Sequence, residues 1–160
     1  MRESAIKGQE IQIRFMEEKD CQEVAGLEQQ CFTVPWSFDS IKQSFVNPNG
    51  YFFVAEREQK IVGYIGMMKA ENEGDILNVA VSTQNRRQGI GTRLMEHLLY
   101  FAQEKGIETL FLEVRESNRG AIALYEQEGW EKMGVRKRYY TNPTEDGIVM
   151  TVDLTTWKMK

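Results

Sequence analysis

The sequence Arg86-Arg87-Gln88-Gly89-Ile90-Gly91 is the stretch that decides the fold. It follows an apolar run at residues 76–81 and precedes a helical pattern that begins at Thr92, which predicts a strand, a turn and a helix. Glycines let the backbone of such a turn approach a ligand closely. The first turn of a helix also has unpaired N–H groups at a positive dipole end. The turn is therefore a candidate cradle for phosphate or pyrophosphate, while the glycine spacing alone fits a surface turn with solvated arginines equally well.

The composition is that of a globular protein. The chain has 160 residues, of which 41% are hydrophobic and 28% are charged, and this length suits one domain with a real core. It contains no run of about 20 apolar residues, the length that a membrane span needs. Residues 1–10 lack the apolar core of a signal peptide. We expect a loose tail at residues 1–10, a single domain at residues 11–160, a cytoplasmic location and no membrane partner.

Charge and cysteine spacing argue against two further classes of protein. The net charge of −4 leaves no basic footprint for direct binding of nucleic acid. Cys21 and Cys31 lie ten residues apart on one predicted helix, and the chain has a single histidine, so metal-ligand spacing is absent from the sequence. We therefore expect no metal, and thiols that stay reduced as is usual in the cytoplasm.

Hydrophobic periodicity predicts the elements on both sides of the glycine turn. Strands are expected at residues 11–15, 51–56, 61–68, 73–81, 109–114, 130–138 and 148–154, with a loop at residues 139–147. Helices are expected at residues 17–31, from Ser37 or Asp39 to residue 46, from the turn to about Lys105, and from Ser117-Asn118 to Gly129. Seven strands and about four helices, antiparallel at first and then βαβ-like, indicate a mixed α/β domain.

Two polar side chains lie at positions where apolar ones would be expected. Glu113 is a carboxylate at the end of an apolar strand, which costs free energy unless the group is paired or used in a reaction. It could form an ion pair with Arg115 on the same face of the strand, or be a catalytic carboxylate. Tyr125 lies at an apolar position of the following helix and could be a core tyrosine with a satisfied hydroxyl.

Two motifs resemble the GNAT (Gcn5-related) N-acetyltransferases. Arg86-x-x-Gly89-x-Gly91, after Asn78-Val79-Ala80-Val81, looks like the acetyl-CoA motif of that family, and Ala123-Leu124-Tyr125-Glu126-x-x-Gly129-Trp130 resembles its second conserved motif. A larger set of motifs is similar to the bacterial RimI subfamily, which acetylates the N-terminal alanine of a small-subunit ribosomal protein, and the similarity runs from about Ile11 to Leu154. Its members are Phe32-x-x-Pro35-Trp36-Ser37, Leu112-Glu113-Val114-Arg115, Ser117-Asn118, Ala121-Ile122-Ala123-Leu124-Tyr125, Arg136-x-x-Tyr139-Tyr140 and Glu145-Asp146-Gly147-Ile148-Val149-Met150.

The resemblance implies a twisted, mixed sheet of seven strands that splays between its fourth and fifth strands, where the co-substrate acetyl-CoA enters. Glu113 matches the general base of the family and Tyr125 its general acid. The resemblance also implies a bulge in the fourth strand, near Val79 to Val81, whose N–H polarises the thioester carbonyl. The residues implied to bind acetyl-CoA are Val79, Ala80 and Val81 at the acetyl-pantetheine arm, Arg87, Gln88, Gly89, Ile90, Gly91 and Thr92 at the pyrophosphate, and Asn118.

The chemistry of such a reaction suits these residue types. An N-terminal α-amine has a pKa of about 7.7–8.0, so a carboxylate such as Glu113 suffices as the base that neutralises it for attack on a thioester. A phenol such as Tyr125 can protonate the leaving thiolate, and no covalent intermediate on a cysteine is needed. Substrate choice is expected in two aromatic segments that flank the thioester, although aromatic residues there could equally pack the sheet ends. The residues concerned are Phe32, Pro35, Trp36, Tyr139 and Tyr140.

We therefore predict an enzyme that acetylates the N-terminal α-amine of a protein, with the N-terminal alanine of a ribosomal protein as the leading substrate. One alternative is a GNAT enzyme acting on lysine side chains, whose pKa near about 10.4 demands a stronger base, or on a small-molecule amine. A further alternative is a non-catalytic module that binds acyl-CoA.

Overall fold

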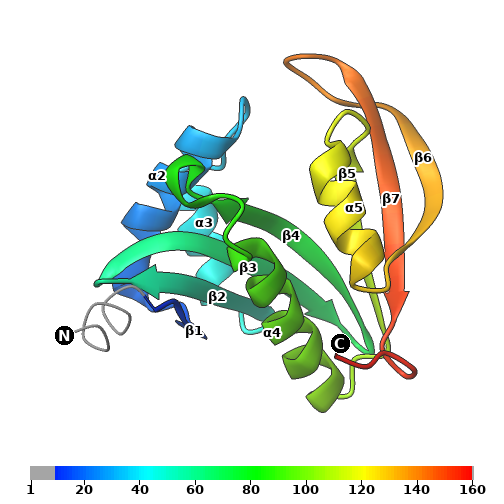
Figure 1. Ribbon diagram of the computed structural model, residues 1–160, viewed down its shortest axis with the longest axis horizontal. Coiled ribbons are helices and arrows are strands. Elements are labelled where there is room, and N and C mark those ends of the chain that lie inside the picture. Colours follow the sequence, from blue (N-terminus) through cyan, green and yellow to red (C-terminus); the bar gives the residue numbers. More distant parts are fainter. Residues whose placement is uncertain (1–9, 160) are drawn as a thin grey trace.

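The computed structural model describes residues 10–159, so the expected N-terminal tail lies outside the described residues except for Glu10. Within this range seven strands form one sheet in the order β1-β2-β3-β4-β5-β7-β6 (Figure 1). The strands are β1 (Gln12–Phe15), β2 (Gly50–Arg57), β3 (Lys60–Ala70), β4 (Glu73–Val81), β5 (Thr109–Arg115), β6 (Glu131–Tyr140) and β7 (Glu145–Asp153). The helices are α2 (Cys21–Cys31), α3 (Phe38–Val46), α4 (Ile90–Glu104) and α5 (Arg119–Gln127), with short 3-10 helices η1 (Glu18–Asp20) and η2 (Thr83–Asn85). The mixed α/β class is confirmed.

The sheet opens between β4 and β5. Strands β1 to β4 are antiparallel, and so are β5, β7 and β6. The parallel pairing of β4 with β5 covers three residues of each strand, with Glu73 opposite Thr109 and Asp75 opposite Phe111. Beyond those pairs the two strands diverge, as Figure 1 shows. The predicted splay between the fourth and fifth strands is therefore confirmed.

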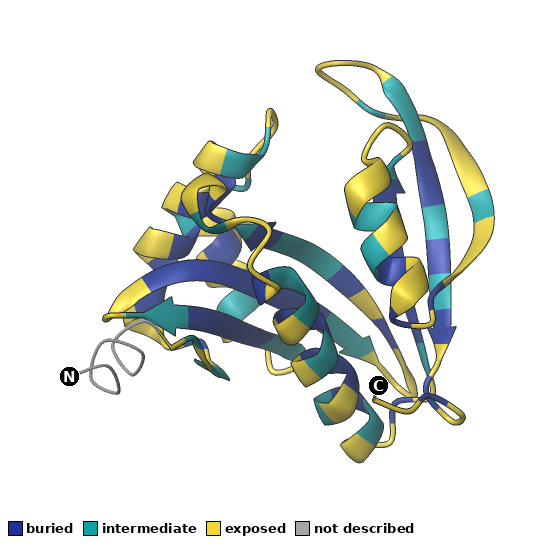
Figure 2. Ribbon diagram, viewed as in Figure 1, coloured by how far each residue is buried: buried dark blue, intermediate teal, exposed yellow. Residues whose placement is uncertain are grey.

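Helices cover both faces of the first half of the sheet. Helix α4 contacts β2, β3 and β4, while α2 contacts β3 and β4, and α3 contacts β2. Because successive strand residues point to opposite faces, Phe53 belongs to one buried cluster with Leu94 and Leu98, and Phe52 belongs to another with Val24. Figure 2 shows β3 buried over most of its length. Burial of each such side chain contributes about 1.5–3 kcal/mol.

Helix ends follow the local sequence. The Ser37 hydroxyl accepts a hydrogen bond from the amide of Ser40 at 3.1 Å, so Ser37 rather than Asp39 caps α3. Gly106 follows α4 with a φ of 81°, a left-handed conformation that suits glycine. The next amide, that of Ile107, donates to the carbonyl of Ala102 at 3.0 Å and closes the last turn.

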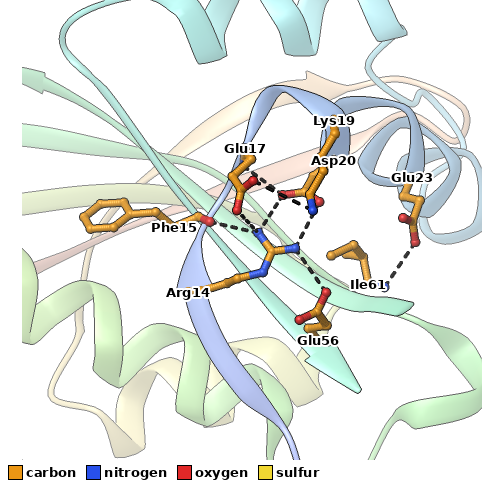
Figure 3. A network of polar contacts seen from close by, with 8 residues as sticks. All are labelled: Arg14, Phe15, Glu17, Lys19, Asp20, Glu23, Glu56 and Ile61. Atoms are coloured by element: carbon orange, nitrogen blue, oxygen red, sulfur yellow. Dashed lines mark hydrogen bonds and ion pairs between the residues drawn. The ribbon is translucent and has the colours of Figure 1, made fainter. Parts of the chain in front are cut away.

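A charged network joins β1 to the rest of the sheet (Figure 3). The guanidinium of Arg14 donates to both oxygens of Asp20, at 2.8 and 3.0 Å, and to Glu56 of β2 at 3.2 Å. The amide of Glu17 donates to the same carboxylate of Asp20 at 2.8 Å. Burial acts to raise the pKa of Asp20, but hydrogen bonds from Arg14 and Glu17 outweigh it and lower that pKa below its usual value. This network fixes the edge strand far from the opening of the sheet.

Two local predictions need correction. The loop expected at residues 139–147 is only a four-residue turn at residues 141–144, because β6 and β7 continue pairing up to Tyr140 opposite Glu145. The bulge in β4 is not at Val79 to Val81. Gly66 of β3 lies opposite Asn78 and Met67 lies opposite Ile76, so the unpaired residue is Leu77.

None of the helices within residues 10–159 is both long and apolar enough to span a membrane.

Candidate functional site

The glycine turn lies at the end of β4, where β4 and β5 have already separated. Residues 86–89 are exposed, whereas Ile90 is buried at 1% exposure, so only its backbone can face a ligand. Arg87 and Gly89 have positive φ values of 63° and 78°. A Cβ on Gly89 would meet no atom within 4 Å, so the backbone conformation, rather than contact with neighbouring atoms, favours glycine there.

The turn is held by contacts that leave its backbone open. Arg57 at the end of β2 donates to the side-chain oxygens of Asn85 and Gln88, each at 2.8 Å. Arg86 donates to the carbonyl of Val81 at 3.2 Å. The side-chain oxygen of the predicted pyrophosphate residue Gln88 therefore already accepts a hydrogen bond from Arg57 at the surface, and Arg87 is exposed.

These features fit an anion such as a pyrophosphate. Helix α4 has 15 residues, and its first amides follow directly on the exposed turn, so unpaired N–H groups and the positive dipole end coincide there. Gly91 lies against Val81 of β4 and Leu124 of α5, since a Cβ on Gly91 would contact them at 3.7 and 3.6 Å. At the mouth of the opening between β4 and β5, the start of α4 therefore lies next to both the end of β4 and helix α5.

The other residues expected to contact acetyl-CoA differ in their exposure. Val79 and Val81 are half-buried on β4, and Ala80 is 3% exposed and belongs to the cluster under α2. Asn118 is exposed and caps α5, its side-chain oxygen accepting from the amide of Ala121 at 3.2 Å. Its side-chain NH₂ is the group left to bind a ligand.

Glu113 has a different partner from the one considered from the sequence. Its carboxylate forms an ion pair with Arg136 of β6, with Oε1 3.0 Å from Nε, and not with Arg115. The interaction of the Tyr139 hydroxyl with Glu113 is the main reason that the pKa of Tyr139 is raised. Asp75 is close enough that Glu113 adds to the effect of burial in raising the pKa of Asp75. The carboxylate is therefore oriented from β6 and is one-quarter exposed.

Tyr125 is buried on α5, as the pattern of apolar residues indicated. It is 9% exposed, and its ring centroid lies 6.3 Å from that of Trp130 in the cluster that includes α4. Burial raises its pKa to about 12, so its phenol remains protonated at neutral pH. The pKa of Tyr140 is likewise raised to about 12, mainly by burial, then by the charges of Glu113 and Tyr139, with a smaller contribution from Tyr125.

The two aromatic segments expected to choose the substrate are joined across the opening. Arg115 at the end of β5 donates to the carbonyls of Thr141 and Pro143 at 2.6 and 2.9 Å, and to Glu145 at 2.9 Å. The nitrogen that donates to Thr141, Nη2, also lies 3.5 Å from the hydroxyl of Thr33, in the segment after α2. Arg115 thereby ties the β6–β7 turn to the segment between α2 and α3.

The aromatic side chains themselves differ in exposure. Tyr139 is 48% exposed and meets Tyr140 edge to face at 5.0 Å, while the Arg115 guanidinium stacks 4.7 Å from the Tyr140 ring. Phe32 and Trp36 are half-buried and pack against the cluster under α2, so both contribute to the core. Pro35 is exposed.

Sequence reasoning missed Glu28, a carboxylate that is completely buried in α2. It accepts hydrogen bonds from the amide of Trp36, the hydroxyl of Tyr64 and the side-chain amide of Asn78, at 2.9, 2.5 and 2.6 Å. Its position in the sequence gave a signal, because residue 28 lies four residues after the buried Val24, on the apolar stripe of the helix. Within residues 10–159, acidic, histidine and cysteine side chains do not gather in a group that could hold a metal ion.

Comparison with known proteins places this geometry in a family. Residues 21–130, well over half of the chain, match the family model described as "Acetyltransferase (GNAT) family". The chain belongs to the GNAT acetyltransferase family.

Individual GNAT proteins align along almost the whole chain. It is 33% identical over 147 residues to "[Ribosomal protein bS18]-alanine N-acetyltransferase" of Escherichia coli K12, covering 89% of this chain and 97% of that protein. It is 31% identical over 149 residues to "N-alpha-acetyltransferase RimI" of Mycobacterium tuberculosis, covering 89% and 92%. The crystal structure of the Escherichia coli ribosomal-protein-S18-alanine N-acetyltransferase superposes with a TM-score of 0.86 at 31% identity, covering 91% of this chain and 94% of that one. The similarity to RimI proteins expected from the motifs is confirmed.

A second solved structure, at lower sequence identity, shares the same architecture. The structure of Ard1 from Thermoplasma volcanium superposes with a TM-score of 0.83 at 27% identity and covers 89% of this chain and 97% of that one. In the GNAT family the co-substrate is acetyl-CoA, which suits the anion site described above.

Proposed function

We propose that this protein transfers the acetyl group of acetyl-CoA to the N-terminal α-amine of a protein, and that its substrate is the N-terminal alanine of a small-subunit ribosomal protein. The observation that carries the proposal is the position of the Glu113 carboxylate, on β5 two residues past the last pair with β4. The names of the aligned relatives support the same substrate. The reaction would then take place in the cytoplasm, where ribosomes are made.

In the proposed complex the open turn and the opened strands hold the co-substrate. The amides of Arg87 to Thr92 bind the pyrophosphate, the backbone of Val79 to Val81 meets the acetyl-pantetheine arm, and Asn118 adds a contact. The bulge at Leu77 frees one backbone amide from the ladder with β3, and such an amide can polarise the thioester carbonyl. Holding amine and thioester together in this way is worth up to roughly 7–11 kcal/mol.

Two side chains would move protons in this reaction. Glu113 accepts a proton from the α-ammonium group, directly or through one water, because an α-amine with a pKa of about 7.7–8.0 is easily neutralised by a carboxylate. The neutral amine attacks the thioester carbonyl, the C–N bond forms and the C–S bond breaks. Tyr125 donates its proton to the leaving thiolate, and its raised pKa of about 12 keeps that proton available at neutral pH. The segments 32–36 and 139–140 flank the amine.

Mass spectrometry of a small peptide panel tests the proposal. The purified protein is incubated with acetyl-CoA and a peptide that begins with alanine and contains an internal lysine. Fragmentation should place the acetyl group on the α-amine and none on the lysine. A matched peptide with a blocked α-amine should remain unmodified. Acetylation of that blocked peptide would indicate a lysine acetyltransferase, and binding of acetyl-CoA without transfer to any amine would indicate a non-catalytic module.

A further inference from the structure

Glu28 is a buried carboxyl group to which the proposed reaction gives no role. Its side chain is fully buried, and it accepts three hydrogen bonds, from the Trp36 amide, the Tyr64 hydroxyl and the Asn78 side-chain amide. Burial raises its pKa, while these donors act in the opposite direction. A buried carboxylate without partners would cost several kcal/mol, so the three donors determine where it can lie.

The donors come from three separate elements, and two of these elements border the proposed reaction site. Trp36 belongs to the segment between α2 and α3, one of the two segments (32–36 and 139–140) that flank the amine in the proposed complex; the space between them is called the acceptor slot below. Asn78 is adjacent to Leu77, the residue that the β4 bulge leaves unpaired. Tyr64 is on β3, directly opposite Ala80 of β4. One carboxylate of α2 therefore touches both the acceptor side and the bulge beside the co-substrate.

A carboxylate suits this position better than any other side chain of its size. Both of its oxygens accept hydrogen bonds, and bonds to a charged acceptor are roughly twice as strong as neutral ones. Glu28 Oε1 serves Trp36, and Oε2 serves both Tyr64 and Asn78. A shift of Asn78 would thus be transmitted through the Glu28 side chain to the backbone of Trp36.

We propose that Glu28 is a positioning residue that fixes the acceptor segment at Trp36 and the β4 bulge at Asn78 in one arrangement. It sets the separation between the incoming amine and the thioester carbonyl and does not itself exchange a proton with either. The inference rests on the proposed N-terminal acetyltransferase function and adds a residue that governs its geometry.

The kinetic constants of Glu28→Met test the role. Met has a similar volume but cannot accept the three hydrogen bonds. The link that Glu28 makes between Trp36 and Asn78, called the bridge below, is therefore lost at both ends. We expect kcat to fall and the KM for the alanine peptide to rise, with a combined loss in kcat/KM of about 100-fold, the scale that a displacement of about 1 Å in an active site produces. The Kd of acetyl-CoA, measured by calorimetry, should stay within about twofold, because Glu28 has no contact with the pyrophosphate turn.

Two further variants separate the ends of the bridge. Asn78→Ala removes the contact with the bulge and leaves the contact with Trp36, so it should lower kcat about tenfold and leave the peptide KM within about twofold. Glu28→Gln retains an acceptor for Trp36, and its NH₂ can donate to the oxygen of Asn78 once that amide rotates. We therefore expect the kcat/KM of Glu28→Gln to be at least tenfold higher than that of Glu28→Met.

Val24→Ala is the matched control for stability. Val24 is fully buried on the same helix, so its truncation should lower the Tm through a cavity. The kcat and the KM values for the alanine peptide and for acetyl-CoA should stay within about twofold of those of the wild-type protein. If Glu28→Met lowers the Tm and leaves the kinetics like those of Val24→Ala, the positioning role is wrong. Should Glu28→Met fail to fold, an unchanged kcat in Asn78→Ala would overturn the proposal equally well. If the wild-type protein does not acetylate the alanine peptide, the proposed function has failed instead.

Discussion

The guanidinium of Arg136 lies 3.0 Å from the carboxylate of Glu113, across an intervening strand. Arg136 is on β6 and Glu113 on β5, so the ion pair reaches over β7, where Gly147 lies opposite Arg136 and Val149 opposite Glu113. The same carboxylate is the main cause of the raised pKa of Tyr139, also on β6. The proposed base is therefore oriented by the far edge of the sheet, and its partners leave a quarter of its surface accessible to an amine.

Replacing Glu113 by Gln should lower kcat by about 10²–10⁴-fold at neutral pH, because general base catalysis typically contributes that much. The Kd of acetyl-CoA should remain within about twofold of the wild-type value, since the pyrophosphate turn is untouched. Steady-state kinetics and calorimetry measure the two quantities. Glu116→Gln, at an exposed position just beyond β5, is the matched control, and equal activity in both variants would remove Glu113 from the base role.

Replacing Tyr125 by Phe should lower kcat at least tenfold while acetyl-CoA still binds, because the ring remains and only the proton donor is lost. The ring packs near Trp130 in the core, so the Tm should change little. An unchanged kcat would assign Tyr125 to the core alone, the alternative that its sequence position leaves open.

The raised pKa of Tyr125 also predicts how stability depends on pH. A group whose pKa is higher in the folded state than in the unfolded state stabilises the fold at pH values below its unfolded pKa. That stabilisation disappears as the pH rises through the folded pKa. For Tyr125 the interval runs from the usual value of 10.0 to about 12, and the loss amounts to about 2–3 kcal/mol. Urea denaturation at pH 9 and at pH 12 should show a smaller loss in Tyr125→Phe than in wild type, and parallel losses would contradict the assignment.

Gly89→Ala should weaken acetyl-CoA binding. The φ at position 89 is 78°, and a Cβ added there would meet no atom within 4 Å, so the cost is conformational strain of about 1–2 kcal/mol and not a clash. Relief of that strain would turn the amides of the turn away from the ligand, and we expect the Kd to rise about tenfold or more. Gly120→Ala, in α5 and equally open but without a positive φ, should leave the Kd unchanged. Equal Kd values in the two variants would show that the turn is not the anion site.

Arg115→Ala should raise the KM for the peptide about tenfold, which corresponds to about 1.4 kcal/mol of acceptor binding. The substitution removes the hydrogen bonds to Thr141, Pro143 and Thr33 that join the two sides of the acceptor slot. The Kd of acetyl-CoA should not change. Arg119→Ala, exposed at the start of α5, controls for loss of positive charge, and a peptide KM that is unaffected by Arg115→Ala would separate this residue from substrate binding.

Features decided by nearby residues were predictable from the sequence. The strand Glu73–Val81 and the cap at Ser37 match their predictions, because hydrophobic alternation and a hydroxyl before a helical pattern act within a few residues. The splay of the sheet and the RimI similarity followed from resemblance of motifs, not from periodicity. The splay is a property of the assembled fold, which local periodicity does not report.

Features decided by distant residues were not predictable in this way. The spacing of Glu113 and Arg115 suggested an ion pair, but the register of β6 with β7 brings Arg136 to Glu113 and Glu145 to Arg115. The bulge at Leu77 depends on how β4 pairs with β3. Glu28 broke an apolar stripe, yet its partners Trp36, Tyr64 and Asn78 are 8, 36 and 50 residues away in sequence.

Because β4 and β5 pair over only three residues, the facing edges of these two strands are unpaired beyond that point. If acetyl-CoA lies there as proposed, its pantetheine arm, itself built from amide units, serves as a surrogate strand that completes the ladder. A ligand recognised through main-chain groups tolerates wide drift in the side chains around it. Relatives that share only about a third of their residues with this chain can therefore keep one donor molecule in common while the walls of the acceptor slot diversify.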